Sequence, residues 1–166
     1  TNEELVQSFN EYVSIFNEEN KTLIESGDIE ALEPSSTEFI KKASGIEQRY
    51  VQDKSGILDV KRMRPRLKER PNSDLSILAE MAVSASREAL DQAHLKASDI
   101  DAVICGCSNL QRAYPAIAIE VQEELKINGY AYDMNVACSS ATFSIQNAFN
   151  DIRSGVAEKI LVVNPE

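Results

Sequence analysis

The apolar residues of the first stretch of the chain recur at a spacing close to that of a helix. They run from Asn2 to about Ser26 and are Leu5, Val6, Phe9, Val13, Phe16 and Leu23. This spacing predicts a helix that begins near Thr1 and that Gly27 ends. The helix start at Thr1 suggests that residues upstream are missing.

A second, shorter helix is expected where polar residues precede an apolar turn. Ser35–Glu38 resembles a helix N-cap followed by an acidic first turn, and it predicts a helix over about Thr37–Ala43 that Gly45 ends. Ile46–Gln52 favours a short strand.

From Ser73 onward, helical and strand patterns alternate. Ser73 is expected to cap a long amphipathic helix, whose apolar stripe is Leu75, Leu78, Ala79, Ala82, Ala85, Ala89 and Leu90. The apolar run Asp101–Cys107 suits a buried strand. Pro115–Leu125 predicts a helix with proline in its first turn.

The last part of the chain continues the alternation. Ala131–Val136 predicts a strand, and Ser139–Ser154 predicts a helix that Gly155 ends. The stripe expected to pack is Ala141, Ile145, Ala148, Phe149 and Ile152. Lys159–Val163 favours a final buried strand. Strands separated by helices imply a mainly parallel sheet covered on both faces, so the predicted fold class is α/β.

Composition and charge exclude several classes of protein. The 166 residues are enough for one compact domain, and apolar runs such as Ile160–Val163 are far shorter than a membrane span. No signal peptide is visible. Three cysteines favour reduced thiols in a cytoplasmic protein. A net charge of −10 argues against general binding to nucleic acid.

Lys61–Arg70 is the exception to this acidic composition. Its positive residues are Lys61, Arg62, Arg64, Arg66, Lys68 and Arg70, and Glu69 is its single acid. Pro65 and Pro71 make a long helix unfavourable, so this stretch is predicted to be an exposed basic loop.

Cys138 is the candidate nucleophile. It lies between the strand predicted to end at Val136 and the helix predicted to begin at Ser139. Such a turn exposes a side chain at the carboxyl end of a parallel sheet, where ligands bind. The amides of a helix N-terminus stabilise a thiolate and can hold the oxygen of a thioester under attack. The residues alone leave open that Cys138 is a buried structural cysteine.

The segment around Cys138 carries a family resemblance. Asp133–Phe143 (DMNVACSSATF), with Ile152–Gly155 and Leu161–Glu166, resembles the nucleophile region of the β-ketoacyl-acyl-carrier-protein synthase III family, which has the thiolase fold. Further similar segments are Thr1–Leu5, Phe39–Ile46, Asp99–Asp101 and Pro115–Gln122, so the resemblance covers nearly the whole chain.

This resemblance implies a condensing enzyme of fatty acid biosynthesis. Cys138 would take an acyl primer from acyl-CoA, and the carbanion from decarboxylated malonyl-carrier protein would then attack the acyl-cysteine. The implied partners are acyl-CoA, an acyl carrier protein and a second subunit of a homodimer, with no cofactor. The alternatives are a non-catalytic partner subunit of the same fold, and an acyltransferase to an acceptor other than malonyl-carrier protein.

The chain departs from the family pattern in its decarboxylation residues. The family's His and Asn lie in the second half of its subunits, whereas the single histidine here, His94, matches a helix end and is expected to be structural. Residues 1–166 are therefore expected to be the N-terminal thiolase-like domain, trimmed at both ends and lacking the C-terminal half. Alone, this chain is not expected to complete the condensation.

The CoA-binding residues depart as well. The Trp and Arg that sandwich the CoA adenine in the family correspond here to Phe39, which can still stack, and to Ala43, which carries no charge. Arg62, Arg64 and Arg66 of the basic loop could supply that charge to CoA phosphates or to the acidic carrier protein. Alternatively, the loop docks on the protein's own surface or on a dimer partner.

Two segments resemble one branch of the family, the β-ketodecanoyl synthase type that takes medium-chain primers. They are Cys107–Pro115 and Lys61–Arg70. In the family, the residue matching Tyr114 lines the acyl pocket of the dimer partner; ordinary interface packing is the alternative. Cys105 and Cys107 share one face of their strand and are interpreted as small buried residues. No metal site is expected, because no second pair of ligands has zinc-like spacing.

Overall fold

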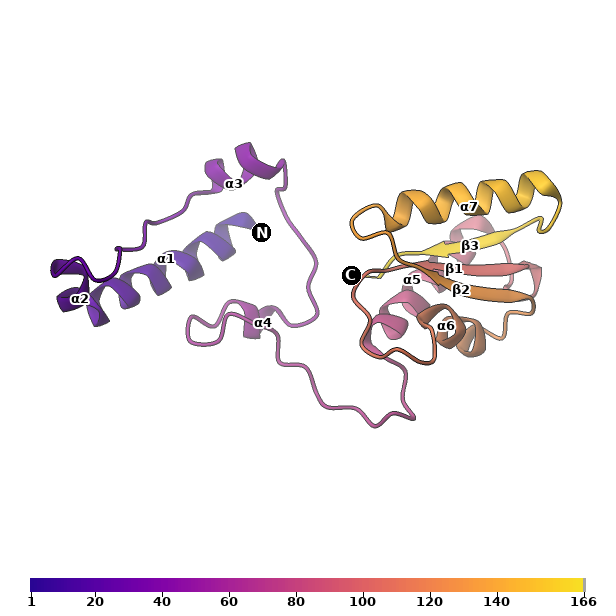
Figure 1. Cartoon of the computed structure of the whole chain (residues 1–166), viewed down its shortest axis with the longest axis horizontal. Coiled ribbons are helices and arrows are strands. Elements are labelled where there is room, and N and C mark those ends of the chain that lie inside the picture. Colours follow the sequence, from indigo (N-terminus) through magenta and orange to yellow (C-terminus); the bar gives the residue numbers. More distant parts are fainter. Residues whose placement is uncertain (166) are drawn as a thin grey trace. The chain divides into compact units, whose positions relative to one another are not determined.

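The computed structural model describes residues 1–165 and consists of two compact units (Figure 1). The first unit is Thr1–Glu69, and the second begins at Arg70.

The first unit is helical. Its helices are α1 (Asn2–Glu19), α2 (Lys21–Glu25), α3 (Thr37–Ser44) and α4 (Lys54–Ile57). The Thr1 hydroxyl accepts from the Glu4 amide and forms a capping box, which confirms the predicted helix start. The first helix is shorter than expected, because it ends at Asn20 and a separate short helix follows.

The second predicted helix is confirmed at both ends. The Ser36 hydroxyl accepts from the Phe39 amide at 3.1 Å, and Gly45 ends α3 with a φ of 73°.

The strand expected at Ile46–Gln52 is wrong. This segment has no strand partner, and its carbonyl groups bond to the start of α1 instead. The Asn2 side-chain amide donates to the Ile46 carbonyl at 2.7 Å, and the Asn2 main-chain amide donates to the Glu47 carbonyl at 3.3 Å.

The second unit is an α/β domain, which confirms the predicted fold class. Its elements are α5 (Ile77–Ala93), the 3₁₀ turn η1 (Ala97–Asp99), β1 (Ala102–Gly106), α6 (Ile117–Leu125), β2 (Tyr130–Met134), α7 (Ser140–Ser154) and β3 (Ile160–Val163). The strand order is β2-β1-β3, and both pairings are parallel.

Two helix starts in this unit differ from the prediction. Ser76, not Ser73, caps α5: its hydroxyl accepts from the Ala79 amide at 3.1 Å and donates to the Glu120 carboxylate at 2.7 Å. Pro115 precedes α6, whose N-cap is Ala116.

The two crossover helices cover opposite faces of the sheet (Figure 1). The chain moves from the central strand β1 through α6 to one edge, and then returns through α7 across β1 to the other edge. Right-handed crossovers in opposite directions place their helices on opposite faces.

The apolar core is formed mainly by α5, α6 and the sheet. It consists of Leu78, Ala79, Ala82, Val83, Leu90, Ile100, Val103, Cys105, Cys107, Ile117, Ala118, Val121, Ile127, Leu161 and Val163. Ala85 and Ala89, which were expected in the apolar stripe of α5, are exposed, whereas Val83 and Ser86 are buried.

Helix α7 contacts the sheet through a stripe that the pattern did not predict. Its buried residues are Ser140, Ser144 and Ala148. Of the expected stripe only Ala148 is buried, and Ala141, Ile145, Phe149 and Ile152 are exposed. Small residues are required because this helix lies close to β1: a Cβ added at Gly106 would lie 2.7 Å from the Ser144 hydroxyl.

Candidate active site

The carboxyl ends of β1 and β2 are the expected binding place in this sheet. These strands are neighbours, and the helices that follow them leave toward opposite faces. Ligands of open parallel sheets bind where the connections diverge in this way. The chain segment that follows β2 at this point carries Cys138.

The turn between β2 and α7 is short and tightly bonded. The Ser139 amide donates to the Val136 carbonyl at 3.0 Å, and the Ser140 amide donates to the Ala137 carbonyl at 3.0 Å. Ala137 has a φ of 47°, in the left-handed region that residues with a Cβ rarely adopt. Cys138 is exposed, so the interpretation of Cys138 as a buried structural cysteine is wrong.

The Ser140 side chain connects the start of α7 to this turn. Its hydroxyl accepts from the Val136 amide at 2.9 Å and donates to the Ala137 carbonyl at 2.7 Å. Ser140 is 3% exposed. Both polar functions of the hydroxyl are therefore used to hold the turn that carries Cys138.

The N-terminus of α7 has no side-chain cap. Its N-cap residue is Ser139, whose hydroxyl bonds to no amide of the first turn. The helix start thus presents amides and the positive end of the helix dipole beside the exposed thiol.

The neighbouring helix α6 is capped from outside its own sequence. Asp133, in β2, accepts from the Ile117 amide at 2.9 Å and from the Ala118 amide at 2.8 Å. One of the two helix N-termini near this sheet edge is therefore occupied by a carboxylate of the protein itself.

Gly106, the last residue of β1, allows α7 to approach the sheet. A Cβ at this position would lie 2.2 Å from Asn164 Oδ1, and 3.1 Å from the Ser140 carbonyl carbon. The Ser144 hydroxyl is buried there without a hydrogen-bond partner. A side chain at position 106 would displace the first turn of α7.

The other two cysteines are unlike Cys138. Cys105 and Cys107 are fully buried, which confirms the expectation of small buried residues. Burial raises the pKa of the Cys105 thiol, and the nearby Asp133 charge adds to this effect. Within residues 1–165, no group of three or more His, Cys, Asp or Glu side chains is arranged to hold a metal ion.

His94 lies at the end of α5, as expected for a structural histidine. It is the C-cap of this helix and adopts a φ of 55°. Its ring is exposed.

The remaining predicted site residues are divided between the two units. Phe39, on α3, is 65% exposed, and Arg62, Arg64 and Arg66 also belong to the first unit. Tyr114 lies in the loop before α6 in the second unit and is 87% exposed. Within that unit the structure places Tyr114 and Cys138 in the loops that follow adjacent strands.

The basic loop is exposed and irregular, as predicted, and part of its charge is used locally. Arg66 pairs with Asp59 at 2.7 Å, and its main-chain amide donates to Asp53. Hydrogen bonds from the Ser55 hydroxyl and from the amides of Arg66 and Gly56 lower the pKa of Asp53 to about 2.

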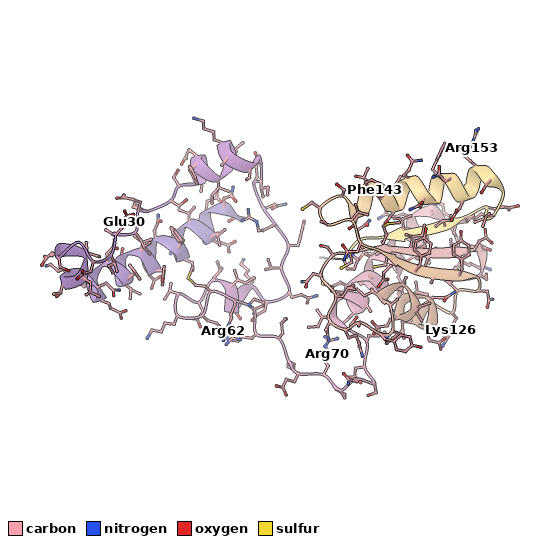
Figure 2. The ribbon with its side chains drawn as sticks, viewed as in Figure 1. Glu30, Arg62, Arg70, Lys126, Phe143 and Arg153 are labelled. Carbon is pink, nitrogen blue, oxygen red and sulfur yellow. The ribbon has the colours of Figure 1, made fainter. Side chains whose placement is uncertain are left out.

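The other two arginines of this loop differ in their contacts. Arg62, which is labelled in Figure 2, donates to the carbonyls of Arg64 and Pro65. Within the described residues, the Arg64 side chain has no hydrogen-bond or ion-pair partner. Arg66 thus pairs with acids that immediately precede the loop, whereas Arg64 has no such partner in the described part of the chain.

Sequence reasoning missed a polar network that fixes the loop before α6. The buried Glu120 carboxylate accepts from the Ser76 amide at 2.8 Å and from the Arg112 guanidinium at 3.1 Å. Arg112 also donates to the carbonyls of Asn72 and Asp74. The available signal was an acidic residue inside the apolar run Ile117–Val121.

The fold and this turn define an α/β domain with an exposed cysteine before an uncapped helix, at the carboxyl end of a parallel sheet. Residues 64–166 match the family described as the thiolase N-terminal domain. The chain belongs to this family.

Named relatives are condensing enzymes. The chain is 59% identical over 161 residues to a beta-ketodecanoyl-acyl-carrier-protein synthase of Pseudomonas aeruginosa, covering 97% of this chain and 46% of that protein. It is 32% identical to a beta-ketoacyl-acyl-carrier-protein synthase III of Dinoroseobacter shibae, over 87% of this chain and 39% of that protein. The chain therefore spans less than half the length of these relatives.

Solved structures agree with this family. A 3-oxoacyl-acyl-carrier-protein synthase III of Aquifex aeolicus is 27% identical, with a TM-score of 0.60 over 78% of this chain and 36% of that one. A synthase III of Thermus thermophilus is 24% identical, with a TM-score of 0.58 over 84% of this chain and 37% of that one, and it supports the fold alone. None of the helices within residues 1–165 has the length and apolar character needed to cross a membrane.

Proposed function

We propose that the protein to which this chain belongs is a condensing enzyme of the β-ketoacyl-acyl-carrier-protein synthase III type. The observation that carries this proposal is the exposed Cys138, on a tight turn before an uncapped helix, at the carboxyl edge of a parallel sheet. The proposal is further supported by the 59% identity to the Pseudomonas aeruginosa enzyme.

In the first proposed step, the Cys138 thiolate attacks the carbonyl carbon of an acyl-CoA thioester. The bond from the carbonyl carbon to the CoA sulfur breaks, and CoA leaves as a thiol after taking up a proton. Amides at the start of α7 stabilise the negative charge that develops on the carbonyl oxygen. The product of this step is an acyl-cysteine.

In the second step, a malonyl group on the carrier protein loses carbon dioxide, and the resulting carbanion attacks the acyl-cysteine carbonyl. A carbon–carbon bond forms and the Cys138 sulfur leaves, which returns the free thiolate. The His and Asn that promote decarboxylation in this family belong to the C-terminal half of its subunits. Residues 1–166 are thus proposed to be the N-terminal domain, which supplies the acyl-accepting nucleophile but not the residues that promote decarboxylation.

We propose an octanoyl primer. The relative named for a beta-ketodecanoyl product is the more similar of the two described above, at 59% against 32% identity. Condensation with a malonyl unit adds two carbons, so a β-ketodecanoyl product requires an eight-carbon primer.

Further residues of this chain are proposed to bind substrate. Phe39 would stack on the CoA adenine, and Arg64, together with Arg62 and Arg66, would contact CoA phosphates or the acidic carrier protein. Tyr114 would line the acyl pocket of the partner subunit in a cytoplasmic homodimer, and its 87% exposure supports this role. No cofactor beyond the two substrates is proposed.

A condensation assay tests this function. The full-length protein is mixed with octanoyl-CoA and malonyl-carrier protein, and the β-ketoacyl product is identified by mass spectrometry. We expect β-ketodecanoyl-carrier protein from the wild type and none from Cys138→Ala. A loaded Cys138 without β-keto product would indicate an acyltransferase to another acceptor. Absence of loading would indicate a non-catalytic subunit.

A further inference from the structure

We propose that Ser140 is the positioning residue of the nucleophile: its hydroxyl holds the turn that presents Cys138 toward the acyl donor. This inference rests on the proposed function of Cys138 as an acyl acceptor. Ser140 does not contact the reacting atoms in this account, and it acts through the main chain of Val136 and Ala137.

The hydroxyl is bonded in both directions to the segment immediately before Cys138. It accepts from the Val136 amide at 2.9 Å and donates to the Ala137 carbonyl at 2.7 Å. The single hydroxyl proton is committed to that carbonyl, so this side chain is not free to give a proton to a substrate. Its role is therefore to hold the main chain through these two hydrogen bonds, a pair that we call the staple.

The staple holds a conformation that alanine does not adopt readily. Ala137 has a φ of 47°, and a left-handed residue with a Cβ persists only where its surroundings fix it. The Ser140 hydroxyl and the Ser140 amide both donate to the carbonyl of this residue. Without the hydroxyl, the Ala137 carbonyl loses one of its two hydrogen bonds, and only the Ser140 amide and the bond from the Ala137 amide to Asn135 Oδ1 (3.2 Å) remain. The direction of the Cys138 side chain is expected to change with this loss.

The staple is itself anchored to the sheet. Ser140 is 3% exposed, and its main chain lies against the last residue of β1, where Gly106 leaves no room for a side chain. Because the Ser140 main chain packs against the sheet, the bonds of its hydroxyl fix the turn relative to the sheet. Ser139, one residue earlier, is exposed, and its hydroxyl forms no capping bond. Ser139→Ala therefore removes the same chemical group without removing a staple, and it is the matched control.

The test measures the rate at which octanoyl-CoA acylates Cys138 in the full-length protein, together with thermal unfolding. Ser140→Ala is expected to slow acylation by about 10- to 100-fold, because small misplacements of a reacting group have effects of this size. Ser139→Ala is expected to stay within about twofold of the wild type, because surface substitutions have small effects. An unchanged rate in a folded Ser140→Ala protein would overturn the inference.

A second substitution separates positioning from a loss of stability. Glycine adopts positive φ without the penalty of a Cβ, so Ala137→Gly in the Ser140→Ala background should recover part of the acylation rate. The unfolding temperature should stay below that of the wild type, because the hydrogen bonds of the hydroxyl remain absent even though glycine relieves the strain at position 137. If Ser140→Ala alone does not fold, the double variant still tests the proposal by its own acylation rate. A double variant that folds but is no faster than Ser140→Ala, or slower than the wild type by much more than tenfold, would contradict the proposal.

A crystal structure of Ser140→Ala distinguishes the failure of this inference from the failure of the proposed function. If wild-type Cys138 is not acylated, the proposed function fails, whatever the role of Ser140. In the variant structure Ala137 is expected to leave the left-handed region. Retention of a φ near the wild-type value would overturn the inference independently of activity.

Discussion

Two adjacent strands of the sheet end in turns that each carry a cysteine, and the turns have opposite properties. After β1, Cys107 is fully buried, and the helix that follows, α6, has its first amides bonded to the Asp133 carboxylate. After β2, Cys138 is exposed, and the helix that follows, α7, has no side-chain cap.

This difference separates a strand end that is buried and capped from one that is exposed and uncapped, and the exposed one carries the cysteine proposed to react. A helix N-terminus that holds an internal carboxylate has its dipole and amides already satisfied. A helix N-terminus without such an anion can stabilise the negative charge of a thiolate or of a thioester oxygen. The residue type is the same in both turns, so burial and capping decide which cysteine can react.

Thiol alkylation should show the largest difference between the two turns. In native protein, iodoacetamide is expected to modify Cys138 at least about 100-fold faster than Cys105 or Cys107, because core thiols react only after local opening. Peptide mapping by mass spectrometry measures the three rates. Raising the pH from neutral to mildly alkaline should not ionise the Cys105 thiol, since burial raises its pKa. Comparable modification of all three in folded protein would remove the distinction.

Gly106→Ala should disrupt the packing of the start of α7 against the end of β1. The added methyl group would lie 3.1 Å from the Ser140 carbonyl carbon, and it would also displace the Asn164 and Ser144 side chains. Overpacking of this kind costs about 1–3 kcal/mol of unfolding free energy, which urea denaturation measures.

Gly155→Ala is the matched control for this substitution. Gly155 has a φ of 76° and no atom within 4 Å of an added Cβ, so only backbone strain is introduced, of about 1 kcal/mol. The two variants should also differ in acylation rate, with only Gly106→Ala slowing it. Equal effects of both on that rate would argue against a tight packing of α7 on β1.

Ser139→Asp would place a carboxylate at the start of α7, as Asp133 does at the start of α6. A carboxylate at the N-cap of α7 should stabilise the helix by about 0.5–1 kcal/mol, because aspartate is a favourable N-cap. The same negative charge opposes the developing oxyanion, so acylation of Cys138 should slow by about tenfold. Stopped-flow measurement of CoA release gives this rate, with Ser139→Asn as the uncharged control. Faster acylation in Ser139→Asp would contradict a role for the helix N-terminus.

Asp133→Asn should have the smallest effect on the acylation of Cys138. Each carboxylate oxygen accepts from one amide, Oδ2 from Ile117 and Oδ1 from Ala118, so asparagine keeps one acceptor and sets an NH2 donor against the other amide. The loss of this bond and of the charge should lower the unfolding free energy by about 1–3 kcal/mol. Urea denaturation measures this change. The acylation rate of Cys138 should remain within about twofold, since the start of α7 is untouched. A loss of acylation rate well beyond twofold would show that the two turns are coupled.

The sequence predicted the parts of the fold that depend on local pattern. The apolar run before Cys107 and the segment before Cys138 became adjacent parallel strands, and the turn at Cys138 lies where expected. The cap of α5 was misplaced by three residues because Ser73 and Ser76 are equally good local candidates. The partner that selects Ser76, Glu120, is distant in sequence.

Other errors share this dependence on distant contacts. Periodicity identified an apolar stripe on α7 through Ile145 and Phe149, but it could not tell which face the sheet covers, and close approach to Gly106 selected Ser144 instead. The strand expected at Ile46–Gln52 has no partner strand, and the start of α1 binds its carbonyls. The sequence did not indicate the proposed role of Ser140, because serine is common at helix starts.

The mass of the Cys138 peptide shows directly whether Cys138 accepts an acyl group from a thioester. Full-length protein is incubated with octanoyl-CoA without malonyl-carrier protein, quenched in acid and digested. We expect an octanoyl adduct on the peptide that contains Cys138, and none on those that contain Cys105 and Cys107. An adduct elsewhere, with Cys138 unmodified, would contradict the claim that this turn carries the nucleophile.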